Sequence, residues 1–118
     1  MQIKWNDKEP IYRQLRDKLV ELILEGVYQN GDSLPSVRQV SSEHRINPIT
    51  VSKAFQMLVD DDLVEKRRGV GMFVIEGARE QLIADERERF IREDWPQIIA
   101  RIERLGLDPV QLIDQSEI

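Results

Sequence analysis

The sequence has 118 residues and a formal net charge of −5, and its composition already restricts its function. Hydrophobic residues make up 41% and charged residues 33%, a balance typical of a folded globular domain. No run of about 18 apolar residues occurs and the start lacks the apolar stretch of a signal peptide, so we expect a cytoplasmic protein without a membrane span. With no cysteine and one histidine, His44, the chain has no thiolate or His-rich metal site, no cysteine nucleophile and few candidates for an acid–base relay. We therefore expect neither an enzyme nor a cofactor.

The excess negative charge is confined to the C-terminal part of the chain. Residues 1–75 hold 11 basic and 11 acidic side chains, whereas residues 76–118 hold 6 basic and 11 acidic ones. Binding of a polyanion by bulk charge is thus disfavoured, but the neutral N-terminal part can still carry a local basic surface. We predict two regions, with a boundary after Ile75.

The first helix is predicted over residues 10–25. Apolar residues recur there at intervals of three or four, Pro10 stands in the first turn, and Gly26 follows as a C-terminal cap. The dipeptide Asn30-Gly31 then predicts a turn.

Two further helix starts follow closely. Ser36 and Gln39 fit a capping box, in which the serine hydroxyl caps the first turn and the glutamine reaches back. Asn47 and Pro48 fit the N-cap and first position of a third helix, and Ile46 and Val51 fit a hydrophobic staple around that start. We expect a compact unit of three helices.

The third helix has two unlike faces. At about 100° per residue, one face faces the core and the opposite face faces solvent, with Thr50 on the flank. No acidic residue occurs from Asn47 to Val59, and Asp60, Asp61 and Asp62 follow at the predicted helix end. The core face consists of Val51, Ala54, Phe55 and Leu58, and the outer face of Ile49, Ser52, Lys53 and Gln56.

A basic β-hairpin is predicted after the third helix. Residues 63–67 and 72–75 favour strands, and glycines stand in the turn between them. Lys66, Arg67 and Arg68 give the hairpin a positive tip.

The remaining residues predict helices that cannot form a core alone. Charges dominate residues 78–93, Asp94 and Trp95 fit a new helix start, and a last short helix begins at Asp108 and carries Leu112 and Ile113. A region this small rarely buries enough apolar surface to fold by itself, so we expect it to form a dimer with a second copy. The expected dimerisation residues are Leu82, Phe90, Trp95, Ile98, Ile99, Ile102 and Leu105. A ligand pocket lined by the residues from Trp95 to Leu105 is the alternative for that helix.

Three helices followed by a hairpin form the order of a winged helix-turn-helix. In that fold a helix enters the DNA major groove, while the hairpin, or wing, lies along phosphates or in the minor groove. The predicted fold is therefore mainly α with a small β-hairpin, a winged helix-turn-helix in residues 1–75, followed by a helical dimerisation region in residues 76–118.

Four separated sequence motifs together resemble one protein family. The segments Pro10-Ile11-Tyr12, Gly31-Asp32-Ser33-Leu34-Pro35-Ser36-Val37-Arg38, Asn47 to Phe55, and Gly69-Val70-Gly71-Met72-Phe73-Val74 occur in order. Together they resemble the DNA-binding domain of the GntR family of bacterial transcriptional regulators, over roughly residues 9–75. The short helical tail is similar to that of the YtrA subfamily.

The resemblance implies a set of DNA-contacting residues. Arg38 would contact DNA from the second helix, the third helix would read the groove, and Arg68 with Gly69 would form the wing tip. The capping role of Asn47 also explains that residue without DNA. The outer-face pattern agrees on Lys53 and adds Gln56, so the predicted set is Ser36, Arg38, Asn47, Thr50, Ser52, Lys53, Gln56, Arg67, Arg68 and Gly69.

A function follows from the resemblance together with the predicted dimer. We expect a homodimeric regulator, most simply a repressor, that binds a near-palindromic double-stranded operator, and the resemblance implies control of transporter genes. No effector can be named. The alternative is a winged-helix module whose basic wing binds an acidic protein without specific DNA binding.

Four positions depart from the family pattern. Arg45 and Asp62 stand where relatives often have glycine, so the turn at Arg45 either changes its geometry or gains a phosphate contact. Pro48 and Ile49 replace polar base-reading residues.

Overall fold

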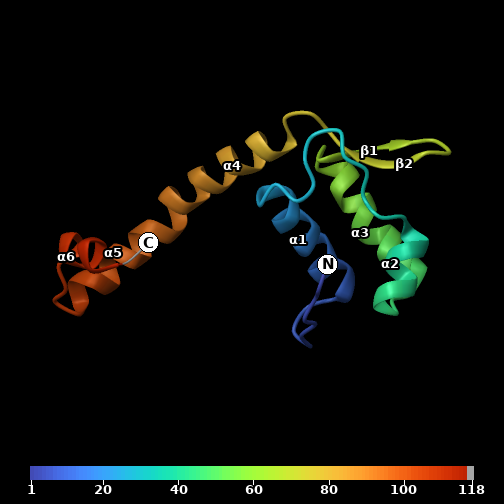
Figure 1. Cartoon of the computed structure of the whole chain (residues 1–118). Helices are drawn as coiled ribbons and strands as arrows, with labels where there is room; N and C mark the ends of the chain where they lie inside the picture. Colours follow the sequence, from blue (N-terminus) through green and yellow to red (C-terminus); the bar gives the residue numbers. More distant parts are fainter. Residues whose placement is uncertain (117–118) are drawn as a thin grey trace. The chain divides into compact units, whose positions relative to one another are not determined.

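The computed structural model describes residues 1–116 and shows helices followed by a hairpin and further helices (Figure 1). The chain divides into two compact units, Met1–Leu82 and Ile83–Ile118, whereas the sequence predicts a boundary after Ile75. The elements are α1 (Ile11–Leu24), α2 (Val37–His44), α3 (Pro48–Asp60), β1 (Val64–Arg67), β2 (Gly71–Val74), α4 (Ala78–Arg89), a π-helical turn η1 (Phe90–Asp94), α5 (Trp95–Arg104) and α6 (Pro109–Gln115). The mainly helical class with one small hairpin is thereby confirmed.

The caps of the first three helices follow the local sequence, with one exception. Gly26 has φ +81°, and the next amide, that of Val27, donates to the Leu22 carbonyl at 2.9 Å, which closes α1. The Ser36 hydroxyl accepts from the Gln39 amide at 3.0 Å, as predicted. The Gln39 side chain does not reach back, because its amide nitrogen lies 3.3 Å from a carboxylate oxygen of Glu43 one turn later. The capping box is therefore only half formed.

The core of the first unit is built around α3, which packs against both α1 and α2. The predicted core face of α3 is fully confirmed, since none of its side chains is more than 1% exposed. Burial of each large apolar side chain contributes roughly 1.5–3 kcal/mol, so this face fixes the orientation of α3. The core is completed by Leu15, Leu19, Ile23, Leu34, Val40, Ile46, Leu63, Val64, Val74 and Ala78.

The hairpin is attached to the helical core rather than free. Strands β1 and β2 are antiparallel, with Val64 opposite Val74 and Arg67 opposite Gly71. The loop before α2 lies along the second strand, where the Leu34 amide donates to the Met72 carbonyl at 2.8 Å. Because this loop covers the edge of β2, the wing has a fixed base from which its tip projects.

The C-terminal helices differ from the prediction at the start of α5. Asp94 has helical backbone angles and makes no capping hydrogen bond with its side chain. The Trp95 amide instead donates to the Phe90 carbonyl, five residues earlier. Because Pro96 has no amide hydrogen and its ring crowds the preceding turn, a π-helical turn lets the chain remain helical there.

The end of α5 and the start of α6 follow the predicted signals. Gly106, with φ +68°, ends α5, and the Asp108 side chain accepts from the Val110 amide at 3.0 Å to start α6. No helix in residues 1–116 is long and apolar enough to cross a membrane.

Candidate nucleic-acid interface

The outer face of α3 carries Ile49, Ser52, Lys53 and Gln56, all of them exposed. Their spacing of three, four and seven residues from Ile49 places them along one side of the helix. Thr50 is half-buried on the flank, as predicted. This side of α3 combines hydrogen-bonding groups, one positive charge and one apolar side chain.

Lys53 is held by a residue that sequence reasoning did not select. Its ammonium nitrogen lies 4.0 Å from the ring centroid of Tyr12, which comes from the first turn of α1. A cation over an aromatic face is attracted to the ring, so Tyr12 restrains the lysine at the surface. The pairing depends on how α1 packs against α3 and leaves no signal in the local sequence.

Two other predicted residues are already engaged within the chain. The Gln56 amide nitrogen donates to an Asp60 carboxylate oxygen at 2.9 Å, one turn further along α3. The Asn47 side-chain oxygen accepts from the Ile49 amide at 2.8 Å and caps the helix. The capping explanation for Asn47 is thus confirmed, whereas its contact with DNA stays a prediction.

The wing presents its basic residues on a sharp turn. Lys66, Arg67 and Arg68 are all exposed, and Gly69 has φ +76°, a conformation that glycine adopts at little cost. The guanidinium of Arg67 pairs with Glu65 at 3.0 Å and lies 4.1 Å from the ring centroid of Phe73. Arg67 is therefore braced against its own hairpin.

A groove of about 370 Å³ lies between the start of α2, the outer side of α3 and the wing. Its lining brings together five of the ten predicted DNA-contacting residues, namely Ser36, Ser52, Gln56, Arg67 and Gly69. The other five, Arg38, Asn47, Thr50, Lys53 and Arg68, are not among its lining residues. Arg38 is exposed in the first turn of α2.

The two departures from glycine keep the backbone that glycine favours. Arg45 has φ 52° and Asp62 has φ 58°, both in the left-handed region. The turn at Arg45 therefore has the left-handed geometry, and a phosphate contact by its side chain stays a prediction. Arg45 directly follows α2 and Asp62 stands two residues after the end of α3, where a left-handed residue lets the chain leave the helix.

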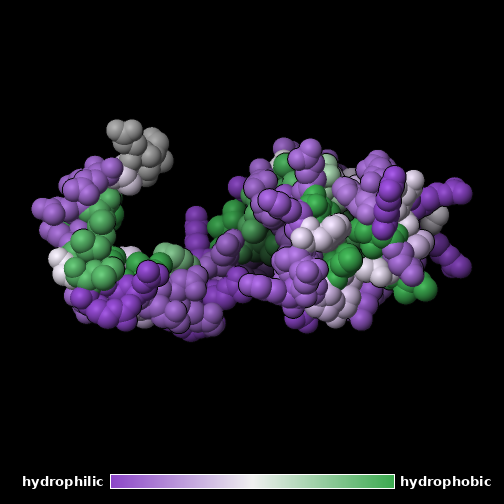
Figure 2. Space-filling model, turned by 90° about the horizontal axis from the view of Figure 1, so that it is seen from below, coloured by the Kyte–Doolittle hydropathy of each residue, from purple (hydrophilic) through white to green (hydrophobic). Residues whose placement is uncertain are grey.

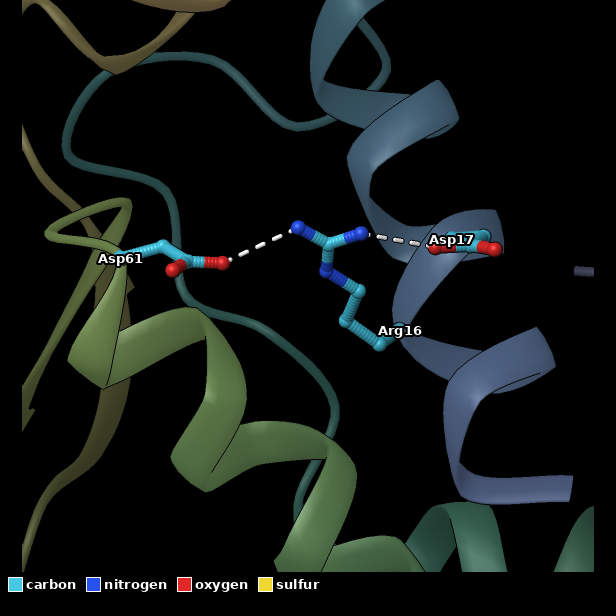
Figure 3. Close-up of polar contacts among 3 residues, drawn as sticks. All are labelled: Arg16, Asp17 and Asp61. Carbon is cyan, nitrogen blue, oxygen red and sulfur yellow. Dashed lines mark hydrogen bonds and ion pairs between the residues drawn. The ribbon is translucent and has the colours of Figure 1, made fainter. Parts of the chain in front are cut away.

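An ion-pair cluster links α1 to the end of α3 (Figure 3). The Arg16 guanidinium lies 2.8 Å from Asp17 and 3.0 Å from Asp61. Burial acts to lower the pKa of Arg16, but its hydrogen bonds with the two carboxylates and their charges raise it above its ordinary value. The guanidinium stays charged and joins the first helix to the last turn of the third.

The C-terminal unit exposes many of its large apolar side chains, which gather on its surface in Figure 2. Ile99 and Ile102 are half-buried, and the Phe90 and Trp95 rings lie 6.5 Å apart. Leu82 differs from the other expected dimerisation residues, because it packs against the core of the first unit. The exposed members are Phe90, Trp95, Ile98 and Leu105.

Comparison with known proteins identifies the family of the chain. The family model "Bacterial regulatory proteins, gntR family" matches residues 11–74. The chain is 34% identical over 108 residues to the HTH-type transcriptional repressor YtrA of Bacillus subtilis, covering 92% of this chain and 82% of that protein.

Solved structures agree over nearly the whole length. A GntR family transcriptional regulator from Listeria monocytogenes has a TM-score of 0.74 at 28% identity, covering 93% of this chain and 95% of that one. YtrA from Sulfolobus acidocaldarius, a GntR-family transcription factor, has a TM-score of 0.60 at 27% identity, covering 90% and 96%. These relatives are transcriptional regulators and not enzymes, and the chain belongs to the GntR family of DNA-binding transcriptional regulators.

Proposed function

We propose that the chain works in the cytoplasm as a homodimer that represses transcription by occupying a near-palindromic operator. The outer face of α3 enters the major groove, and the wing lies against the adjacent phosphates and minor groove. The observation that carries this proposal is the exposed side of α3 beside a basic wing, in a segment free of acidic residues from Asn47 to Val59.

Charge supports DNA as the ligand despite the acidic total. Lys53 on α3, Arg38 at the start of α2, and Lys66 and Arg68 on the wing are exposed cations around the groove face. Each cation that neutralises a phosphate releases a counterion, which gives affinity that falls steeply with salt. The acidic residues of the C-terminal region lie outside the segment that forms α2, α3 and the wing.

The exposed apolar side chains of the C-terminal unit support the dimer. Trp95 and Ile98 are about 40% exposed and Leu105 is 62% exposed, a cost that a second copy would remove by covering them. Two winged units joined in this way would place two α3 helices in successive major grooves, roughly 34–36 Å apart.

Repression follows if the dimer covers a promoter. The name of the Bacillus subtilis relative, a transcriptional repressor, supports this sign of regulation. Transporter genes are the proposed targets. An effector would release the operator only by binding better to a dimer geometry that fits DNA poorly.

Fluorescence anisotropy tests the DNA-binding face. The purified chain is titrated onto DNA from upstream of its own gene at several salt concentrations, with scrambled DNA as competitor. We expect competitor-resistant binding, and Lys53→Ala should weaken it and reduce the magnitude of the slope of log K against log salt by about 0.9 if one phosphate contact is lost.

Lys18→Ala is the matched control. It also removes one positive charge, but Lys18 lies in α1 and pairs with Glu21 at 3.7 Å. Equal weakening by both variants would contradict a specific role for α3. Equal affinity for the upstream and the scrambled DNA, together with a selection from a random DNA library that enriches no sequence, would instead support the acidic-protein partner.

A further inference from the structure

Ile49 is more exposed than any other large hydrophobic side chain among residues 1–116. Its exposed fraction is 78%, compared with 40% for Trp95 and 70% for Val70. The side chain therefore contributes little to the folded core, although a neighbouring position of α3 is part of that core. Val51, two residues later, is fully buried.

The position of Ile49 is well defined even though its side chain is exposed. Pro48 fixes one backbone angle before it, and the Asn47 side chain accepts from its amide at 2.8 Å. Ile49 thus stands rigidly in the first turn of α3. The first turn is the part of a groove-reading helix that reaches the base edges.

Ile49 also shares its side of the helix with the polar members of the outer face. Ser52, Lys53 and Gln56 follow it by three, four and seven residues and are exposed with it. If this face meets DNA, Ile49 is carried into the same groove. An apolar group at that point cannot donate or accept a hydrogen bond.

We propose that Ile49 is a specificity-determining residue that contacts the C5 methyl group of a thymine in the major groove. This inference rests on the proposed function. Among the groups that bases display in the major groove, the thymine methyl is the only apolar group larger than a hydrogen atom, whereas the oxygen and nitrogen groups are hydrogen-bond acceptors or donors. Covering a donor or acceptor with isoleucine leaves it without a partner, so the same side chain that favours thymine disfavours other bases.

Selection and single-methyl substitution test the proposal. Wild-type protein is used to select binding sites from a random DNA library, and each thymine of the selected site is then replaced by deoxyuridine, which removes only the methyl group. Affinities of wild type, Ile49→Ala and Val27→Ala are measured for each DNA. Val27 is the control because it is 57% exposed and lies in the loop after α1.

The expected result is a methyl effect that depends on Ile49. At one thymine in each half-site, deoxyuridine should weaken the wild type and Val27→Ala about fourfold, the value of one buried methyl group. Ile49→Ala should bind the thymine and deoxyuridine forms equally at that position. Its melting temperature should match that of the wild type, because the residue is exposed.

Two results would overturn the proposal and are distinguishable. If a site is enriched but none of its thymines shows a methyl effect that depends on Ile49, this contact is rejected and the DNA-binding function stays intact. A library from which the wild-type protein enriches no sequence would overturn both the contact and the proposed function.

Discussion

At the scale of single residues, two turns keep a backbone conformation that glycine would adopt more easily. Arg45 and Asp62 have φ values of 52° and 58°. The left-handed conformation costs a residue with a Cβ atom roughly 1–2 kcal/mol. Replacing such a residue by glycine removes this cost, but the additional chain entropy that glycine loses on folding offsets about half of the gain. Both turns are therefore points where stability can be raised without changing the fold.

Arg45→Gly should stabilise the chain by about 0.5–1 kcal/mol in urea unfolding, since the strain is removed at the cost of extra chain entropy. Arg45→Ala keeps the Cβ atom and should give no such gain. An Arg45→Gly variant less stable than Arg45→Ala would show that the arginine side chain itself stabilises this turn.

Tyr12 has a predicted role through Lys53, whose ammonium lies 4.0 Å from its ring centroid. Tyr12→Phe keeps an aromatic face and should leave DNA affinity close to that of the wild type. Tyr12→Leu should weaken binding about two- to fivefold, the range expected for an exposed cation–π contact.

Lys53→Ala provides the matched background for this test. If Tyr12 acts by positioning the lysine, Tyr12→Leu should have no further effect on DNA affinity once Lys53 is absent. An equal loss in both backgrounds, measured by anisotropy, would assign Tyr12 an independent effect.

At the scale of elements, α3 is oriented mainly by apolar burial, with a smaller polar link at its end. The four core-face side chains are at most 1% exposed, whereas the Arg16 and Asp61 side chains that join α1 to α3 are 31% and 48% exposed. Solvent screening at such exposure limits an ion pair to about 1 kcal/mol or less.

Asp61→Asn should accordingly lower the free energy of unfolding by less than about 1 kcal/mol, and the difference from wild type should shrink in 1 M salt. Asp32→Asn, which also removes one carboxylate, is unsuitable as a control because Asp32 caps its own loop at 2.8 Å. Asp7→Asn in the N-terminal segment, an exposed position, serves instead. A salt-independent loss of several kcal/mol would indicate that Asp61 is essential to the turn after α3.

The elements set by local pattern were predictable, and those set by distant partners were not. The core face of α3 and the Asn47 cap follow from residues a few positions apart. The Arg16–Asp61 pair joins residues 45 positions apart, so nothing in the local sequence indicates it. Leu82 lies in the predicted dimerisation region as one of its few large apolar residues, but it packs on the core of the first unit. Pro96 fits a helix start, and the π-helical turn that accommodates it has no sequence signal of its own.

At the scale of the whole molecule, the proposed dimer depends on the apolar side of α5. The apolar positions of α5 lie on one side of the helix, with Ile99 among the half-buried ones. A charged residue there should prevent a second copy from covering the face, because an unpaired carboxylate is costly to bury.

Ile99→Asp should halve the mass measured by light scattering, from two chains to one. Gln97→Asp adds the same charge on the other side of α5, where Gln97 is exposed, and should leave the dimer unchanged. Unchanged mass in Ile99→Asp would exclude this face from the dimer interface.

Hydroxyl-radical footprinting of the wild-type chain on a selected operator tests the central claim most directly. A dimer that inserts two α3 helices should protect two symmetric patches whose centres are about 10–10.5 base pairs apart or a multiple of that, each flanked by weaker protection where a wing lies. A single protected patch, or protection without two-fold symmetry, would contradict the dimeric, groove-reading regulator.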